Sequence, residues 1–153
     1  MDLNKATEKT REALSQAQVI AVKNGHQTAD EPHLLLAMLG QDNGLAPRII
    51  AKLDLEPAVL AAQTEKLVQQ IPSVRGSGVA PGQIAVTREL NELLVRAADE
   101  AKRMDDEYIS IEHVLLAFLS GGKTATRRLL ESFNITKDRL SQAITAVRGG
   151  QRV

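Results

Sequence analysis

The sequence has no cysteine and no tryptophan, and its 153 residues include only one tyrosine and two phenylalanines. Without cysteine, disulfide bonds, thiolate metal sites and a cysteine nucleophile are excluded. With so few aromatic side chains the core must be aliphatic, and alanine and leucine contribute 20 residues each. Both are strong helix formers, whereas sheets draw on β-branched and aromatic residues. The composition therefore predicts an all-α fold.

An excess of charge of either sign is also missing. The 19 Lys and Arg residues balance 19 Asp and Glu residues, so we expect no nucleic-acid-binding face. The longest apolar run has six residues, too few to cross a membrane. The N-terminus, Met-Asp-Leu-Asn-Lys, lacks the basic and apolar regions of a signal peptide. We therefore expect a soluble, cytoplasmic protein that contacts neither nucleic acid nor membrane.

What the sequence does contain is an internal repeat with an offset of 80 residues. Residues 34–39 read Leu-Leu-Leu-Ala-Met-Leu, and residues 114–119 read Val-Leu-Leu-Ala-Phe-Leu. A histidine precedes each run, His33 in the first and His113 in the second. Such a pattern indicates that one structural unit has been duplicated.

The alignment of the two copies needs no gap. Residues 7–67 match 87–147 at 12 identical positions, and most other apolar positions agree in type. We therefore predict one domain over 1–147, with a first repeat at about 4–70, a linker at 71–86 that is rich in Gly and Pro, and a second repeat at about 87–147.

Each repeat divides into four helices, which predicts about eight helices and no sheet. In the first repeat, Leu14 and Ala21 lie on one helical stripe that Gly25 ends, and Asp30 caps the next helix, with Pro32 in its first turn. The second repeat follows the same plan from its cap residues Thr87, Ser110 and Thr136. The two apolar runs are predicted to be central helices packed on several sides.

The segment Ser120-Gly121-Gly122-Lys123-Thr124 resembles the end of a phosphate-binding loop. That motif also needs a glycine five residues before the lysine and a preceding strand. Phe118 stands at the glycine position, and a helix is predicted before the loop. We therefore predict a turn between two helices and no ATP site in this chain.

The paired histidines could be metal ligands or packed side chains. His33 and His113 each follow a helix cap by three residues, and no acidic cluster at ligand spacing accompanies both. We predict that each packs in the first turn of a central helix, close to backbone donors and acceptors. No metal or other cofactor is expected in this chain.

Acidic residues gather before the second central helix. Asp105, Asp106, Glu107 and Glu112 place four carboxylates within eight residues. The alternatives are a solvated loop whose acids suit a helix N-terminus, a polar surface that contacts a partner, and the acid/base pair of a small hydrolase. The hydrolase has no evident nucleophile in support.

Two repeats related by a pseudo-twofold axis must meet at a seam. Neither repeat covers its own open face completely, so the seam can leave an apolar groove. Grooves of this kind take up apolar segments of other chains.

The repeat motifs resemble those of the Clp N-terminal domain, most closely in the ClpB (Hsp104-type) disaggregases. The resemblance covers the whole chain and rests on residues 25–39 and 108–119, on the opening residues, on Gly76-Ser77-Gly78, and on the closing Arg148-Gly149-Gly150-Gln151-Arg152-Val153. It implies an all-α double repeat that handles substrate for an ATP-driven, homo-hexameric disaggregase working with the DnaK system. Residues 148–153 would then begin the linker to an AAA+ module, and ATP and magnesium would belong to that module.

The resemblance also implies site residues. Leu94, His113 and Val114 match positions at or beside the family's hydrophobic groove, although His113 replaces a residue that is often apolar. Thr7, Asp106 and Glu112 match polar positions tied to chaperone function, and we expect the two acids to form a polar rim. In related ClpC domains a Glu helps to recognise phosphoarginine, and Pro32 stands in its place in the first repeat.

Two other functions stay open from the sequence. The same fold could dock adaptors for a protease-linked Clp ATPase, and a stand-alone hydrolase would use the acidic loop. A turnover assay on the chain would identify the hydrolase.

Overall fold

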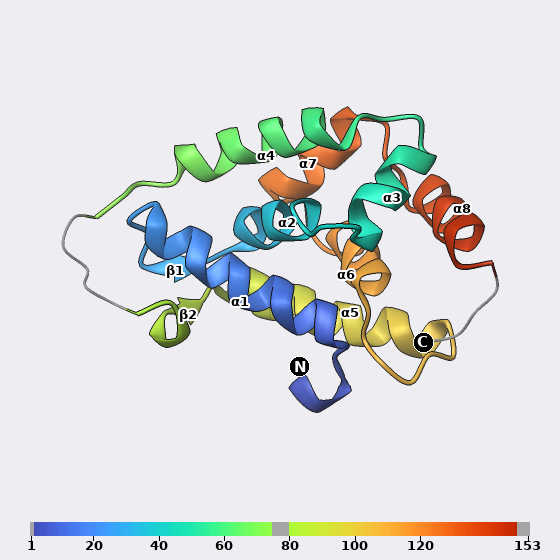
Figure 1. The fold of residues 1–153 in the computed structure, drawn as a ribbon, viewed down its shortest axis with the longest axis horizontal. Helices are drawn as coiled ribbons and strands as arrows, with labels where there is room; N and C mark the ends of the chain where they lie inside the picture. The colour runs from blue at the N-terminus through green and yellow to red at the C-terminus, as the bar shows by residue number, and fades with distance from the viewer. Residues whose placement is uncertain (1, 75–79, 150–153) are drawn as a thin grey trace.

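The computed structural model describes residues 2–74 and 80–149 (Figure 1). Residues 1, 75–79 and 150–153 lie outside it, and they include part of the predicted 71–86 linker and most of the predicted 148–153 linker. The described residues form eight α-helices, as predicted. The first repeat holds α1 (Glu8–Lys23), α2 (Glu31–Leu39), α3 (Leu45–Lys52) and α4 (Pro57–Gln70), and the second holds α5 (Arg88–Arg103), α6 (Ile111–Phe118), α7 (Ala125–Ser132) and α8 (Lys137–Arg148). Two 3-10 helices, η1 (Leu3–Lys5) and η2 (Pro81–Gln83), precede α1 and α5.

The prediction that no sheet forms is wrong in one detail. Strands β1 (Thr28–Ala29) and β2 (Ala85–Val86) pair in parallel, Thr28 with Ala85 and Ala29 with Val86. A second, isolated bridge joins Ala6 to Ile109. Both pairings arise where extended residues enter a helix, and such short stretches carry no periodicity that the sequence could reveal.

The two pairings obey the 80-residue offset and exchange backbone between the repeats. The segment before α1 pairs with the segment before α6, and the segment before α5 pairs with the segment before α2. The amide of Thr7 donates to the carbonyl of Ile109 at 3.0 Å, and the amide of Thr87 donates to that of Ala29 at 2.9 Å. Each repeat therefore supplies the carbonyl that accepts a hydrogen bond from the N-cap amide of the other repeat's first helix.

Helix starts agree with the cap residues expected from the sequence. Thr7 and Thr87 cap α1 and α5, and each hydroxyl accepts the amide proton of the residue three positions later. Thr136 caps α8 in the same way, and Asp30 caps α2. A cap of this kind stabilises a helix by about 1 kcal/mol.

Helix ends use left-handed residues at matching places. Gly25 after α1 has φ +73°, and its counterpart Asp105 after α5 has φ +57°. Asp54 and Asn134, again 80 residues apart, take the same conformation after α3 and α7. Asp and Asn tolerate the left-handed region better than other side chains, which explains why the second repeat manages without Gly25.

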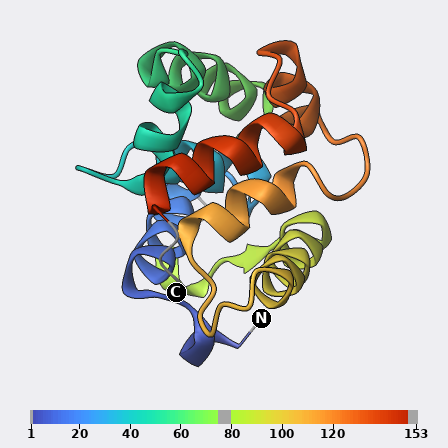
Figure 2. The same ribbon diagram turned by 90° about the vertical axis from the view of Figure 1, so that its right-hand side faces the viewer.

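The central helices α2 and α6 lie between α4 and α7 on one side and α1 and α5 on the other (Figures 1 and 2). Every residue of α6 is buried, and so is every residue of α2 except Leu36. Packing also crosses the repeats, since α3 contacts α8 and α4 contacts α7. The repeats therefore share one hydrophobic core.

The central leucines give the first prediction. Leu35 is 0% exposed and Leu115 is 1% exposed, at equivalent places in α2 and α6. Truncation of either to Ala should lower the free energy of unfolding by roughly 2–5 kcal/mol, because each leaves a cavity in a packed core. Urea denaturation measures this loss. A loss below about 1 kcal/mol at either position would show that the helix is not central.

Candidate functional site: a seam groove and a buried ionic network

A groove of about 360 Å³ lies at the seam between α1 and α5. The two helices contribute Leu14 and Leu94, which are equivalent residues of the two repeats, and the strand pair contributes Ala29 and Val86. Leu3 adds an apolar side chain from η1. The polar members of the lining are Arg11, Ser15, Gln18 and Asn91. This seam groove has the size of a small ligand site and an apolar floor with few charges.

Of the three residues predicted at the groove, one lines it and two do not. Leu94 lines the seam groove but is only 6% exposed, so it also belongs to the core. His113 and Val114 lie on the fully buried α6, at 0% and 1% exposure, and do not line the groove. Because Leu94 is buried to this extent, Leu94→Gln would place an amide in an apolar setting and should lower stability as well as alter the groove.

The structure adds groove residues that the sequence did not indicate. Leu14 is half-buried and Ser15 is exposed, and Leu3 is 55% exposed. The Arg11 guanidinium donates to the carbonyl of Ala6 at 2.8 Å and to that of Leu3 at 3.5 Å. Arg11 thereby holds the η1 segment in the position from which Leu3 closes one part of the groove.

Thr7 belongs to a clamp on the N-terminal segment. Besides capping α1, its hydroxyl lies 2.9 Å from that of Thr10, which donates to the carbonyl of Ile109 at 3.0 Å. The amide of Ile109 in turn donates to the carbonyl of Lys5 at 2.6 Å. We call these contacts of Lys5, Thr7, Thr10 and Ile109 the N-terminal clamp.

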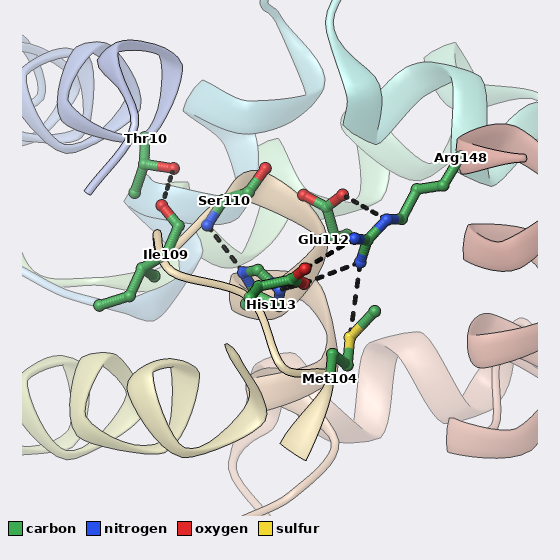
Figure 3. A network of polar contacts seen from close by, with 8 residues as sticks. Thr10, Met104, Ile109, Ser110, Glu112, His113 and Arg148 are labelled. Carbon is green, nitrogen blue, oxygen red and sulfur yellow. Dashed lines mark hydrogen bonds and ion pairs between the residues drawn. The ribbon is translucent and has the colours of Figure 1, made fainter. Parts of the chain in front are cut away.

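Asp106, Glu112, His113 and Arg148 form a buried ionic network (Figure 3). His113 accepts the amide proton of Ser110 on Nδ1 at 2.8 Å, so its Nε2 carries the proton that points to Asp106 at 2.6 Å. Both carboxylate oxygens of Asp106 accept from Arg148, each at 2.8 Å. The histidine prediction is confirmed, because His113 packs in the first helical turn against backbone and carboxylate.

Glu112 completes the network. Its Oε2 lies 3.8 Å from Nε of Arg148, while its other oxygen is buried and has no hydrogen-bond partner. The hydrogen bonds to Asp106 raise the pKa of Arg148 above its usual value, against the opposing effect of burial. The side chains of Asp106 and Glu112 are 0% and 1% exposed, so the expectation that the two acids form a polar rim is wrong.

The first repeat holds a neutral version of this arrangement. His33 accepts the amide proton of Asp30 on Nδ1, and its Nε2 lies 2.8 Å from Nδ1 of His26, the residue equivalent to Asp106. The second nitrogen of His26 is 3.1 Å from the carbonyl of Ile71. Burial, followed by the nearby His26, lowers the pKa of His33 to about 4. The ring is therefore neutral at physiological pH.

Glu31 is a second buried acid, at the start of α2. It is 2% exposed, and Thr124 at the start of α7 donates to it over 3.4 Å. Burial, with a smaller effect of the charge on Asp30, raises the pKa of Glu31 to about 7. The side chain thus links the two repeats while it is partly protonated near neutral pH.

The glycine-rich segment forms the predicted turn between two helices. It joins α6 to α7, and the ammonium group of Lys123 pairs with Glu131 at 2.9 Å. Within the described parts of the chain, no three His, Asp or Glu side chains come together as ligands for a metal ion. No helix among residues 2–74 and 80–149 is long and apolar enough to cross a bilayer.

A family model supports the assignment that the double repeat suggests. Residues 5–133 match the Clp repeat (R) N-terminal domain. The chain belongs to this family. Within it, the Clp repeat domain described here is 48% identical over 153 residues to the chaperone protein ClpB of Bacillus cereus and 40% identical over 154 residues to ClpB of Nitratidesulfovibrio vulgaris. In both comparisons the whole chain is matched, and it spans 18% of the relative.

Solved structures share the fold of this Clp repeat domain. The Hsp104 N-terminal domain from Candida albicans superposes with a TM-score of 0.81, with 97% of this chain and 94% of that chain covered at 18% identity. The N-domain of ClpV from Vibrio cholerae gives a TM-score of 0.74 at 17% identity and covers 97% and 88%. At these identities the likeness shows the architecture, and the ClpB matches show the nearer kinship.

Glu31 gives the second prediction. The unfolded chain ionises Glu31 near pH 4.5, whereas the folded domain does so near pH 7, so the unfolded state binds fewer protons in this window. The contribution of Glu31 to stability therefore falls as the pH rises from 4.5 to 7. Glu31→Gln removes this loss and should stabilise the domain by up to about 3 kcal/mol above pH 7, relative to its effect at pH 4.5.

Urea denaturation of both proteins at pH 4.5 and pH 7.5 measures the difference. His33 titrates in the same window but is present in both proteins, so it cancels in the comparison. An equal difference between variant and wild type at the two pH values would contradict a raised pKa for Glu31.

Proposed function

We propose that the domain binds apolar segments of unfolded or aggregated proteins in the seam groove, as the substrate-handling module of a ClpB-type disaggregase. The observation that carries this proposal is the groove itself, in which Leu14 and Leu94 from the two repeats meet beside Leu3 and Val86. The match to ClpB chaperones along the whole chain supports it.

The chemistry of the groove fits a broad and weak binder. Its floor is aliphatic and its lining holds one charged residue, Arg11, so it offers little that selects one sequence over another. Burial of client side chains contributes roughly 25 cal/mol per Å² of apolar surface. Ordering a flexible client opposes this gain, so little net affinity is left. Weak binding suits a module that must hand its client onward.

The wider assignment follows from the same proposal. The longer protein would be a homo-hexameric AAA+ ATPase that threads clients with ATP and magnesium and cooperates with the DnaK system in the cytoplasm. The domain itself would carry no catalysis. The other predicted site residues would act indirectly, by stabilising the fold that forms the groove. Thr7 lies in the N-terminal clamp, Val114 lies in the core, and the buried network holds Asp106, Glu112 and His113.

Groove variants test the function. Ser15 is exposed on the groove wall, so Ser15→Trp should fill the groove with little effect on folding. Leu3→Ser should remove an exposed apolar contact. Each should weaken the binding of a labelled, permanently unfolded protein by about fivefold or more, equivalent to about 1 kcal/mol, in fluorescence anisotropy titrations.

Two matched controls lie outside the groove. Ser141→Trp adds the same bulk on α8, and Val59→Ser removes an apolar side chain of 51% exposure on α4. Both should bind as the wild type does. Unchanged binding in all four variants would remove the groove as the client site and favour adaptor docking instead.

A further inference from the structure

We propose that the Arg148–Asp106 ion pair is a latch that ties the point where the chain leaves the domain to the loop between α5 and α6. The latch is independent of what the seam groove binds.

The pair has the geometry of a specific attachment. Arg148 approaches Asp106 with both terminal nitrogens, each 2.8 Å from a different carboxylate oxygen. Its side chain is 9% exposed and that of Asp106 is 0% exposed. Bidentate pairs of this kind fix orientation as well as distance. Removal from water makes the pair sensitive to geometry, since either charge left alone in this place is costly.

The position of Arg148 makes this contact a latch and not merely part of the core. The sequence predicted that the second repeat ends at 147, but α8 continues through Arg148, its last residue. Gly149 then leaves the helix with φ +61°, and a side chain there would meet nothing within 4 Å. Terminal helical turns open more readily than the middle of a helix, so the pair with Asp106 bears directly on whether this last turn stays closed. Any chain that continues past Gly149 departs from this latch.

The loop that receives Arg148 also holds the other end of the domain. Asp106 is fixed by His113 on α6, and three residues later Ile109 forms the N-terminal clamp with Lys5, Thr7 and Thr10. Figure 3 shows the clamp residues Thr10 and Ile109 on one side of Ser110 and His113, and Arg148 on the other. One loop therefore fixes both the entry to α1 and the exit from α8.

The experiment measures amide hydrogen exchange by NMR in the whole chain. Two amides report on the latch: Gly149, which donates to the carbonyl of Thr145, and Asp106, which donates to that of Ala101. In Arg148→Met both should exchange at least about tenfold faster than in the wild type, because the loop loses its anchor together with the helix end.

A triple variant separates the latch from folding. Arg148→Met alone leaves the carboxyl groups of Asp106 and Glu112 buried without Arg148 and can unfold the domain. Asp106→Asn and Glu112→Gln with Arg148→Met remove the charges of the network together, and the amide at position 106 keeps an oxygen for the proton of His113. In the triple variant, exchange at Gly149 and at residue 106 should still be at least about tenfold faster, while the amide of the central Leu35 exchanges as in the wild type.

Arg139→Met on the same helix is the control, because the Arg139 guanidinium donates to the nearby carbonyl of Asn134 and is not a member of the ionic network. It should leave both reporter amides unchanged. The latch is overturned if the triple variant exchanges no faster than this control, or if only Gly149 accelerates, which is simple fraying of the helix end. Equal acceleration at Leu35, or loss of the fold in the triple variant, also overturns it, because the pair would then serve global stability.

Discussion

The exchange of backbone between the repeats holds the rest of the molecule in place. The amide of Thr7 donates to Ile109 and that of Thr87 donates to Ala29, so the first helix of each repeat begins against the segment that leads into the second helix of the other. Buried backbone groups need such partners, and here each repeat takes them from the other. The hydroxyl of Thr87 adds a hydrogen bond of 2.8 Å to the cap residue Asp30. Two helix starts are therefore fixed by one contact.

The seam groove and the ionic network are consequences of this arrangement. The segments that hold the starts of α1 and α5 come from the opposite repeat, and the groove is lined by residues of both helices beside the β1–β2 pair. The repeats then differ by substitution at equivalent places. His26 in the first repeat corresponds to Asp106 in the second, which turns a neutral histidine pair into a charged site that can receive Arg148. The two repeats share one architecture, and substitutions at equivalent positions give them different buried polar contacts.

Much of the fold follows from the sequence because it rests on local rules. The repeat offset, the caps at Asp30, Thr87 and Thr136, and the two central helices come directly from spacing and composition. The left-handed conformation of Asp54 and Asn134 does not follow from the sequence, since Asp and Asn also occur in ordinary turns.

The site follows from the sequence only in part. Of the predicted site residues, Leu94 does line the groove. The burial of Asp106 and Glu112 depends on Arg148, which lies 42 residues from Asp106 along the chain. A charge pair at that distance leaves no periodic signal, so the acids were expected at the surface.

The central claim is that the two repeats fold as one interlocked unit. Its most direct test is to produce residues 1–74 and 80–153 as separate chains and to follow their helical content by circular dichroism, alone and mixed. Each chain alone should lack a cooperative thermal transition, since the backbone acceptor for the start of its first helix and the core contacts from the other repeat are missing. An equimolar mixture should recover the helical content of the intact chain and melt cooperatively. If either half folds alone with a cooperative transition, and mixing adds no helix, the repeats are independent domains and the account is wrong.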